Sequence, residues 1–137
     1  MERATPLGFT AVVDAPIGEA VERATAALQA EGFGVLTTID VADTMKQKLG
    51  VEMEPYVILG ACNPALAHRG LQAEPGLGLL LPCNVTVREV QGRSEVVAVD
   101  PEAMLGVAGS NDAVKAVATE AAARLRRVAT ALGGQAG

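Results

Sequence analysis

The amino-acid sequence predicts an α+β fold, a two-layer sandwich in which helices pack on one face of a mainly antiparallel sheet. Strand-like and helix-like segments alternate through the first half of the 137-residue chain. Further along, a tight polar turn joins two strand-like segments, which indicates an antiparallel hairpin. We find no internal repeat and no long linker, so we expect a single domain over residues 1–137 with the order β-α-β-α-β-α-β-β-α.

The first two expected strands flank a helix. Residues 6–13 form the first strand and residues 33–39 the second. Pro16 suits the first position of the helix between them, because a proline lacks the N–H that would be unsatisfied there. Gly32 ends this helix as its C-cap. Alternation along the second strand places four side chains on one face of the sheet: Phe33, Val35, Thr37 and Ile39.

The middle of the chain gives a helix, a strand and a further helix. Asp40 is expected to cap a helix that Gly50 closes. Residues 56–62 form a strand that is apolar on both faces, which indicates a central position in the sheet. Residues 63–73 form the third helix, which opens with the sequence Asn-Pro.

The C-terminal part contains the hairpin and a long helix. Its strands are residues 83–90 and 95–100, joined by the turn sequence QGRS. After a single helical turn, Ser110 or Asn111 caps the last helix, which extends to about Leu132. Apolar residues recur in this helix at a spacing of 3.6 residues, so one of its sides should pack on the sheet.

Charge and composition argue against several classes of partner. The formal net charge is −5, and the only local cluster of basic residues is Arg124, Arg126 and Arg127. We therefore expect no nucleic-acid binding and no binding to an anionic membrane surface. No apolar run approaches the ~20 residues of a membrane span, and the N-terminus lacks the apolar core of a signal peptide. We interpret the protein as cytoplasmic, where Cys62 and Cys83 stay reduced.

Residues 56–88 contain both cysteines, the only histidine and the only tyrosine, and we take this stretch as the candidate site. Cys62 ends a strand and precedes Asn63, the expected N-cap of the third helix. The positive end of a helix dipole favours a thiolate, so Cys62 is a candidate reactive or ligating group. The alternative is that Cys62 is a small apolar residue of the core, as buried cysteines usually are.

His68 lies on the same helix, and Cys83 and Asn84 begin the following strand. An imidazole can titrate, donate a proton or bind a metal, although a lone histidine is more often a surface or capping group. If the two strands are neighbours, Cys62 and Cys83 could lie near one another. The spacing C-x5-H-x14-C does not match a zinc pattern, so no particular metal or cofactor is predicted.

The sequence resembles the family called domain of unknown function 302. The resemblance is carried by the segments 32–52, 55–72, 78–89 and 96–106, and most specifically by YVILGACNPALAH and LLPCNV. The motif residues present are Cys62, Asn63, Pro64, His68, Pro82, Cys83 and Asn84. The resemblance implies a compact α+β fold, often seen as a dimer, and assigns no catalytic role to any residue.

Three functional hypotheses follow. The first is a domain that binds a small ligand, a sulfur species or a soft metal through Cys62, His68 and Cys83, with Asn63 and Asn84 beside them. The second is a non-enzymatic interaction domain in which the same motif only shapes the fold. The third is an enzyme with a Cys62 nucleophile and a His68 base, for which no orienting group can be named.

We also expect a homodimer, because an open sheet with helices on one face leaves its other face in need of cover. The apolar runs at 77–82 and 96–99 are the candidates for that interface.

Overall fold

In the computed structural model, which describes residues 5–133, five strands form one sheet in which every neighbouring pair is antiparallel. The order across the sheet is β1-β5-β4-β3-β2. The strands are β1 (Gly8–Val13), β2 (Gly34–Asp40), β3 (Tyr56–Cys62), β4 (Cys83–Val90) and β5 (Arg93–Val99). The predicted α+β class is confirmed, and β3 has the interior position that its apolar faces indicate.

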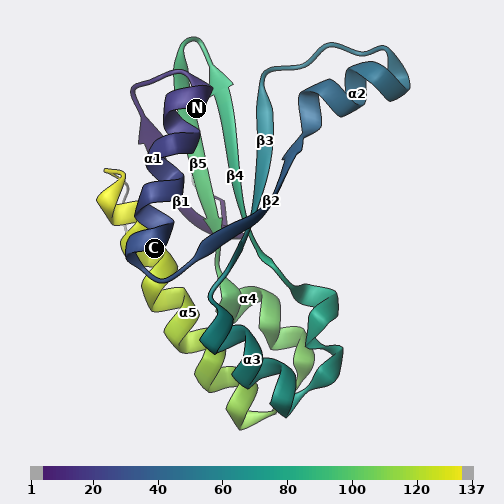
Figure 1. The fold of residues 1–137 in the computed structure, drawn as a ribbon, viewed down its shortest axis with the longest axis vertical. Coiled ribbons are helices and arrows are strands. Elements are labelled where there is room, and N and C mark those ends of the chain that lie inside the picture. The colour runs from purple at the N-terminus through teal and green to yellow at the C-terminus, as the bar shows by residue number, and fades with distance from the viewer. Residues whose placement is uncertain (1–4, 134–137) are drawn as a thin grey trace.

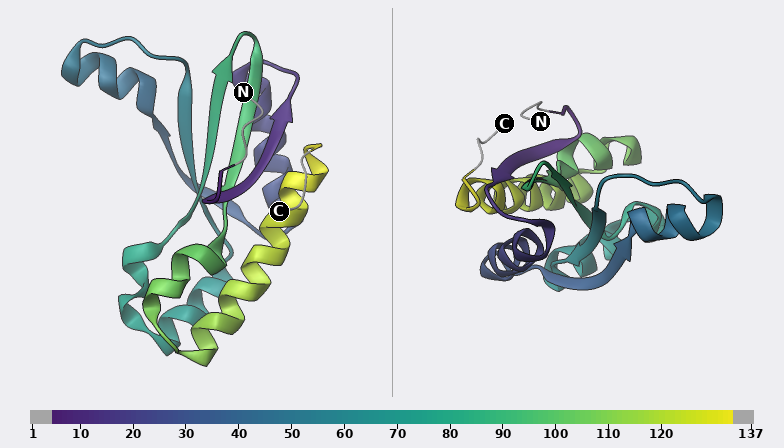
Figure 2. Two further views of the ribbon diagram at one scale, coloured as in Figure 1. Left: turned by 180° about the vertical axis from the view of Figure 1, so that it is seen from behind. Right: turned by 90° about the horizontal axis from the view of Figure 1, so that it is seen from above.

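Two helices cover one face of this sheet, α1 (Ile17–Ala30) and α5 (Asp112–Ala131) (Figures 1 and 2). Phe9, Ala11 and Val13 alternate along β1 toward these helices and are buried, as are the facing residues of the neighbouring strands. The resulting core is aliphatic apart from two phenylalanines. Its most deeply buried members include Leu28, Leu59, Val85, Val87, Val96, Leu125 and Val128.

The remaining helices lie around the ends of the sheet. At one end, α3 (Pro64–Ala73) and α4 (Pro101–Leu105) pack against α5, together with the 3-10 turns η1 (Pro75–Leu80) and η2 (Gly106–Ala108). At the other end, α2 (Val41–Leu49) projects from the body of the molecule (Figure 1) and has no buried residue. Within residues 5–133, no helix has both the length and the apolar character needed to cross a bilayer.

The start of α1 differs from the expectation. Pro16 is the N-cap rather than the first helical residue, and it offers no side-chain hydrogen bond to the helix. The amide of Ile17 instead donates to Glu89 Oε1 at 2.8 Å, a carboxylate from β4. A residue 72 positions away thus supplies the negative group that a helix N-terminus favours.

The prediction that Phe33, Val35, Thr37 and Ile39 share a face is wrong, because β2 contains a bulge. Val35 pairs with Ala61 while Thr37 pairs with Gly60, so Leu36 is the extra residue. Because Ala61 and Gly60 are consecutive, they point to opposite faces of the sheet, and so do the residues that pair with them, Val35 and Thr37. Phe33 precedes the strand, and Leu36 is 70% exposed.

The β4–β5 hairpin is tighter than the sequence indicated. Only Gln91 and Gly92 form the turn, both with positive φ (55° and 80°), as two-residue hairpin turns require. The expected turn residues Arg93 and Ser94 therefore belong to β5, which ends at Val99. The Ser94 hydroxyl is buried and donates to the Ala15 carbonyl at 2.8 Å, tying the hairpin to the start of α1.

Gly32 is not the C-cap of α1, because Glu31 holds that position and Gly32, with a φ of 83°, follows it. The remaining expected caps agree with the structure. Asp40 and Asn63 cap α2 and α3, and Gly50 closes α2 with a φ of 68°. Of the two alternatives for α5, Asn111 is the cap, and its Oδ1 accepts from the amides of Ala113 and Val114. The helix ends at Ala131, one residue before the expected end.

Candidate functional site

The two cysteines lie beside one small cavity, which we call the cysteine cavity. Cys83 is directly opposite Ala61 in the β3–β4 pairing, next in sequence to Cys62. The cavity has a volume of ≈30 Å³ and its other lining is almost entirely apolar, including Phe33, Leu66, Leu77 and Leu105. This is about the space of one water molecule, too little for an organic ligand.

The Cys83 thiol is not activated in this environment. Burial, and to a smaller extent the negative charge of Cys62, raise its pKa from the ordinary 9.0 to about 11. Cys83 is therefore a protonated thiol at neutral pH. Since the thiolate is the nucleophile and the metal ligand, this position favours packing over reactivity.

Asn63 has a structural role. Its Oδ1 accepts from the Leu66 amide at 3.2 Å, and the residue is buried. It also packs on Gly32, which has a φ of +83° and where an added Cβ would come within 2.9 Å of Asn63 Nδ2. The side chain thus joins the start of α3 to the end of α1, as the hypothesis of a structural motif requires.

The structure does not bring His68 into the expected cleft with the cysteines. Its side chain is exposed on α3, and it is absent from the lining of the cysteine cavity. Among the described residues, no group of three or more histidine, cysteine, aspartate or glutamate side chains is placed to hold a metal ion. The expected three-residue ligand set of Cys62, His68 and Cys83 is therefore not formed.

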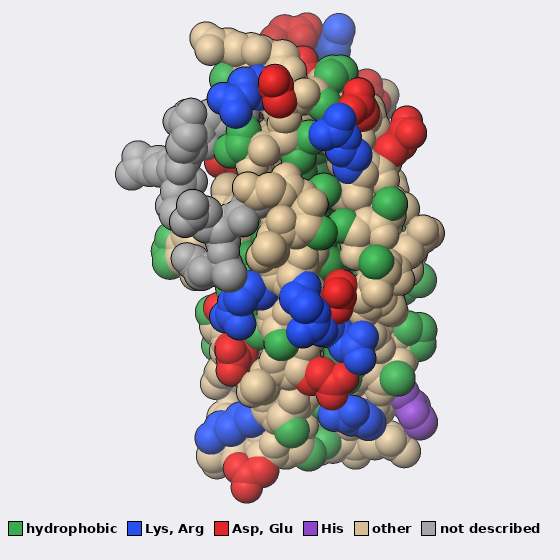
Figure 3. Space-filling view, turned by 90° about the vertical axis from the view of Figure 1, so that its left-hand side faces the viewer, with side chains coloured by type: hydrophobic (Ala, Val, Ile, Leu, Met, Phe, Trp, Pro, Cys, Tyr) green, Lys and Arg blue, Asp and Glu red, His purple; other side chains and the backbone are tan. Residues whose placement is uncertain are grey.

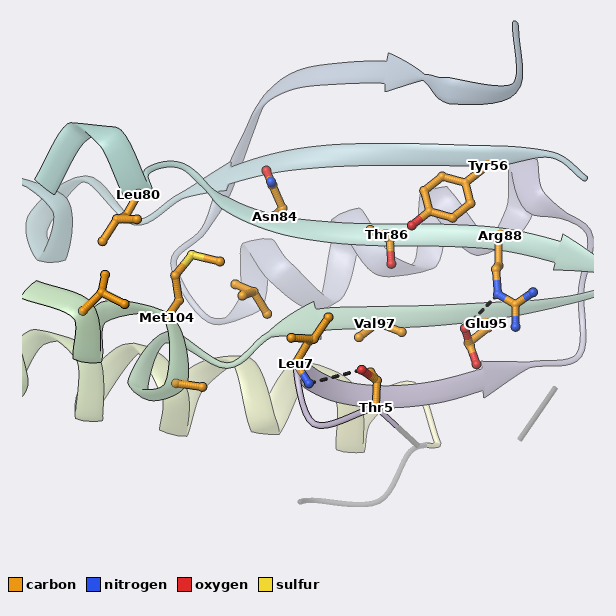
Figure 4. A pocket seen from close by; sticks show the side chains of 13 residues that line it. Thr5, Leu7, Tyr56, Leu80, Asn84, Thr86, Arg88, Glu95, Val97 and Met104 are labelled. Atoms are coloured by element: carbon orange, nitrogen blue, oxygen red, sulfur yellow. Dashed lines mark hydrogen bonds and ion pairs between the residues drawn. The ribbon is translucent and has the colours of Figure 1, made fainter. Parts of the chain in front are cut away.

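A much larger concavity lies on the open face, the face of the sheet opposite α1 and α5 (Figure 4). This open-face hollow has a volume of ≈570 Å³. Asn84 lies in it, as the only predicted site residue that does so. The full lining is Thr5, Leu7, Tyr56, Leu80, Asn84, Thr86, Arg88, Glu95, Val97, Val99, Ala103, Met104 and Val107.

One end of the hollow is charged. Tyr56, Arg88 and Glu95 are successive cross-strand partners on β3, β4 and β5, so their side chains form a row across the sheet. Arg88 Nε donates to Glu95 Oε1 at 2.9 Å, and Arg88 Nη1 lies 3.6 Å from Glu54 Oε2. The hydrogen bond to Glu95 is the main reason that the pKa of Arg88 is raised. The Glu95 side chain is only 9% exposed.

The other end of the hollow is apolar. Leu80, Met104 and Leu7 gather there from η1, α4 and the segment before β1, while Val97 lies on the floor along β5 (Figure 4). Leu7 and Val107 are 72% and 77% exposed, so the rim of the hollow is also apolar.

Sequence reasoning missed most of this site, although one signal was available. Asn84, Thr86 and Arg88 alternate along β4 with the buried Val85 and Val87. Such alternation marks the side of a strand that is not packed in the core. The side of the molecule on which α1 and α5 lie differs from the open face, because charged side chains of both signs are mixed there (Figure 3).

Comparisons with known proteins agree on one family. The model of the family described as domain of unknown function DUF302 matches residues 9–132. The chain is also similar to the crystal structure of an uncharacterised conserved protein DUF302 from Bacillus stearothermophilus. The sequence identity is 30% and the TM-score 0.83, and the match covers 93% of this chain and 98% of that chain. No curated protein matches the chain significantly.

Proposed function

The chain belongs to the domain of unknown function DUF302 family, and we propose that this protein is a small-ligand binding domain whose site is the open-face hollow. The observation that carries the proposal is a hollow of ≈570 Å³ whose largely apolar lining also contains one partly buried ion pair, Arg88–Glu95. Small-molecule sites have volumes of roughly 300–1,000 Å³, with apolar walls and a few polar groups that orient the ligand.

The cysteine motif has a different role in this proposal. The cysteine cavity offers ≈30 Å³, and the Cys83 thiol stays protonated at neutral pH. Both facts speak against a sulfur species or a soft metal as the ligand there. Cys62, Asn63 and Cys83 then hold the ends of β3 and β4 together, and Asn84 alone is part of the ligand site. A Cys62–His68 enzyme has the least support, since His68 lies outside the cavity that Cys62 lines.

A second candidate is an assembly domain that forms a homodimer through the open face. Its support is the exposed apolar rim, where Leu7 and Val107 are each more than two-thirds exposed. Leu79, in the expected interface run 77–82, is 91% exposed. The expected interface runs at 77–82 and 96–99 supply Leu80, Val97 and Val99 to the lining of the hollow. A second copy on this face would close the hollow, so a dimer and a ligand site are compatible. The cytoplasmic location stays a prediction.

The proposal is tested by filling the hollow. Thr86→Trp places an indole on its floor, whereas Thr38→Trp makes the same change on β2 outside it. We expect a neutral apolar dye such as Nile red to bind the wild type and Thr38→Trp saturably, and Thr86→Trp at least several-fold more weakly. Equal binding to both variants, or no saturable binding to the wild type, would refute the site.

The dimer is tested by light scattering at micromolar concentration. We expect about twice the 14.0 kDa chain mass for the wild type. The double variant Leu79→Ser and Val107→Ser should shift the mass toward one chain if the open face is the interface. A wild-type monomer would leave the ligand site without a second copy as its cover and would reject the dimer.

A further inference from the structure

The two ends of the open-face hollow differ in chemistry, and this difference restricts the ligand. Leu80, Met104 and Leu7 gather at one end, and Tyr56, Arg88 and Glu95 lie at the other (Figure 4). Both ends face the same strand, β4, so a molecule that spans them lies along it. The four steps along β4 from Arg88 to Asn84 span ~13 Å, at about 3.3 Å per residue. An elongated molecule with one polar end fits this arrangement.

The charges at the polar end do not cancel. Among the residues that the structure describes, Arg88 and Glu95 are the only charged side chains in the lining, and Glu54 is a second carboxylate near Arg88. One guanidinium thus faces two carboxylates, which leaves the polar end with a net negative charge. Within residues 5–133, the cation that an anionic head group would meet in the lining is Arg88, which already pairs with Glu95 and Glu54, and the desolvation of a charge is not recovered without a partner.

Glu95 can receive a positive or donating head group. One of its oxygens, Oε1, accepts from Arg88 Nε. A carboxylate has about four acceptor positions, so a ligand donor can also bind without displacing Arg88. Tyr56 stands at the other end of the same row, on the far side of Arg88, so Glu95 is the group that receives the head.

We infer that the open-face hollow selects amphipathic molecules with a cationic head, above all an ammonium group, and an aliphatic tail. This inference rests on the proposed ligand site. The head lies at Glu95, at the β5 side of Arg88, and the tail extends along β4 toward Leu80 and Met104. The corresponding carboxylates are discriminated against by the two glutamates.

The test compares three probes that share one tail: decylammonium, decanol and decanoate. Each is titrated into the full chain at neutral pH and low, constant ionic strength, below its own aggregation limit, and binding is followed by amide NMR shifts. We expect decylammonium to bind about tenfold more tightly than decanoate, with decanol between them. A tenfold ratio of the two dissociation constants corresponds to about 1.4 kcal/mol of binding free energy. The shifts should map to β4, β5 and α4.

Variants assign the selectivity to the proposed groups. Glu95→Gln should reduce the ratio between decylammonium and decanoate to about twofold or less while decanol binds as before. Glu54→Gln, at an exposed position, should reduce the ratio partly and gives the same answer if Glu95→Gln does not fold. Glu120→Gln on α5 is the matched control, since this exposed carboxylate pairs with Arg69 and Arg124 outside the hollow, and it should leave the ratio unchanged.

The outcomes separate this inference from the proposed function. If none of the three probes binds saturably in the hollow, the proposed function fails and the inference fails with it. If decanol binds there but decanoate binds as tightly as decylammonium or more tightly, the ligand site stands and the charge selection is overturned. A decylammonium preference that Glu120→Gln removes as much as Glu95→Gln does would reflect only the net charge of the protein, and it also overturns the inference.

Discussion

The cysteine cavity has a volume of ≈30 Å³ and the open-face hollow a volume of ≈570 Å³, although both are built on the same two strands, β3 and β4. Both cysteines lie at the first. Common side chains such as Thr86, Val97 and Met104 line the second. A gathering of cysteines beside Asn-Pro motifs therefore identifies, in this chain, a structural junction, and the space for a ligand lies elsewhere on the sheet.

The two regions differ in this way because their surroundings in the fold differ. At the cysteine cavity, strand ends meet α3, η1, α4 and α5, so small and irregular side chains must fill the gaps. On the open face, no helix within residues 5–133 covers the middle of the sheet, and a hollow of ≈570 Å³ remains there. The predictions below separate the two regions: changes at the first should cost stability, and changes at the second should alter binding.

The largest effect is expected from the titration of Cys83. Its pKa is about 11 in the folded protein, against an ordinary 9.0, so the folded state resists ionisation of this thiol. The thiol thus contributes stability that is full below pH 9.0 and is lost as the pH rises toward 11. The loss is about 2–3 kcal/mol over the whole range. The free energies of unfolding of the wild type and of Cys83→Ala are measured by urea denaturation at several pH values through this range. The advantage of the wild type over Cys83→Ala should shrink by this amount as the pH rises.

The cavity of Cys83→Ala adds a constant cost, so only the change of the difference with pH tests the titration. Two curves that stay parallel through the range would mean that Cys83 ionises as easily in the folded chain as in the unfolded one. The cysteine cavity would then be open to water, and the contrast with the hollow would be lost.

A matched pair of alanine substitutions compares the free space of the two regions directly. Ala61 is fully buried beside the cysteine cavity, and Ala103 lines the hollow from α4. Ala61→Leu should lower the free energy of unfolding by about 1–3 kcal/mol, because the added carbons exceed the available space. Ala103→Leu should stay within about 0.5 kcal/mol of the wild type. Equal losses in chemical denaturation would show that the hollow is packed as closely as the core.

A pair of asparagines tests the same contrast with polar side chains. Asn63 is buried and caps α3, whereas Asn84 is exposed in the hollow. Asn63→Ala should cost about 1 kcal/mol through the lost cap, and Asn84→Ala should cost almost nothing. Thermal unfolding measures both. The reverse order, with Asn84 as the more costly position, would place a structural role at the hollow.

Much of the fold was predictable because its signals are local. The helical and strand periods, the caps Asp40 and Asn63, and the glycine after α2 all depend on residues within one or two turns of each other. The failures at α1 and β2 depend on distant residues. Glu89 supplies the negative group at the start of α1, and the bulge at Leu36 reflects how β2 pairs with β3. Neither partner can be read from the neighbouring sequence.

The candidate site was predictable only in part for a related reason. Residues 56–88 do contain Tyr56, Asn84, Thr86 and Arg88, four of the residues that line the hollow. The emphasis on Cys62 and His68 came from residue type, and chemistry at a site also requires convergence in space. Glu95, the partner of Arg88, carries no signal of its own in the sequence, since a charged residue in an outer position of a hairpin is ordinary.

A small effect on stability is expected from Glu95→Gln. Glu95 is largely buried, but its partner Arg88 is 30% exposed to the hollow and retains Glu54 as a second carboxylate. Partly exposed ion pairs contribute about 1 kcal/mol or less, and a glutamine keeps the size of the side chain and an acceptor for Arg88. Urea unfolding should therefore show a loss below about 1 kcal/mol, smaller still in high salt because ions screen the pair. A loss of about 3 kcal/mol or more, unaffected by salt, is the behaviour of a buried structural pair. That result would make the row of Tyr56, Arg88 and Glu95 a second structural junction, and the charged end of the hollow could no longer be assigned to a ligand.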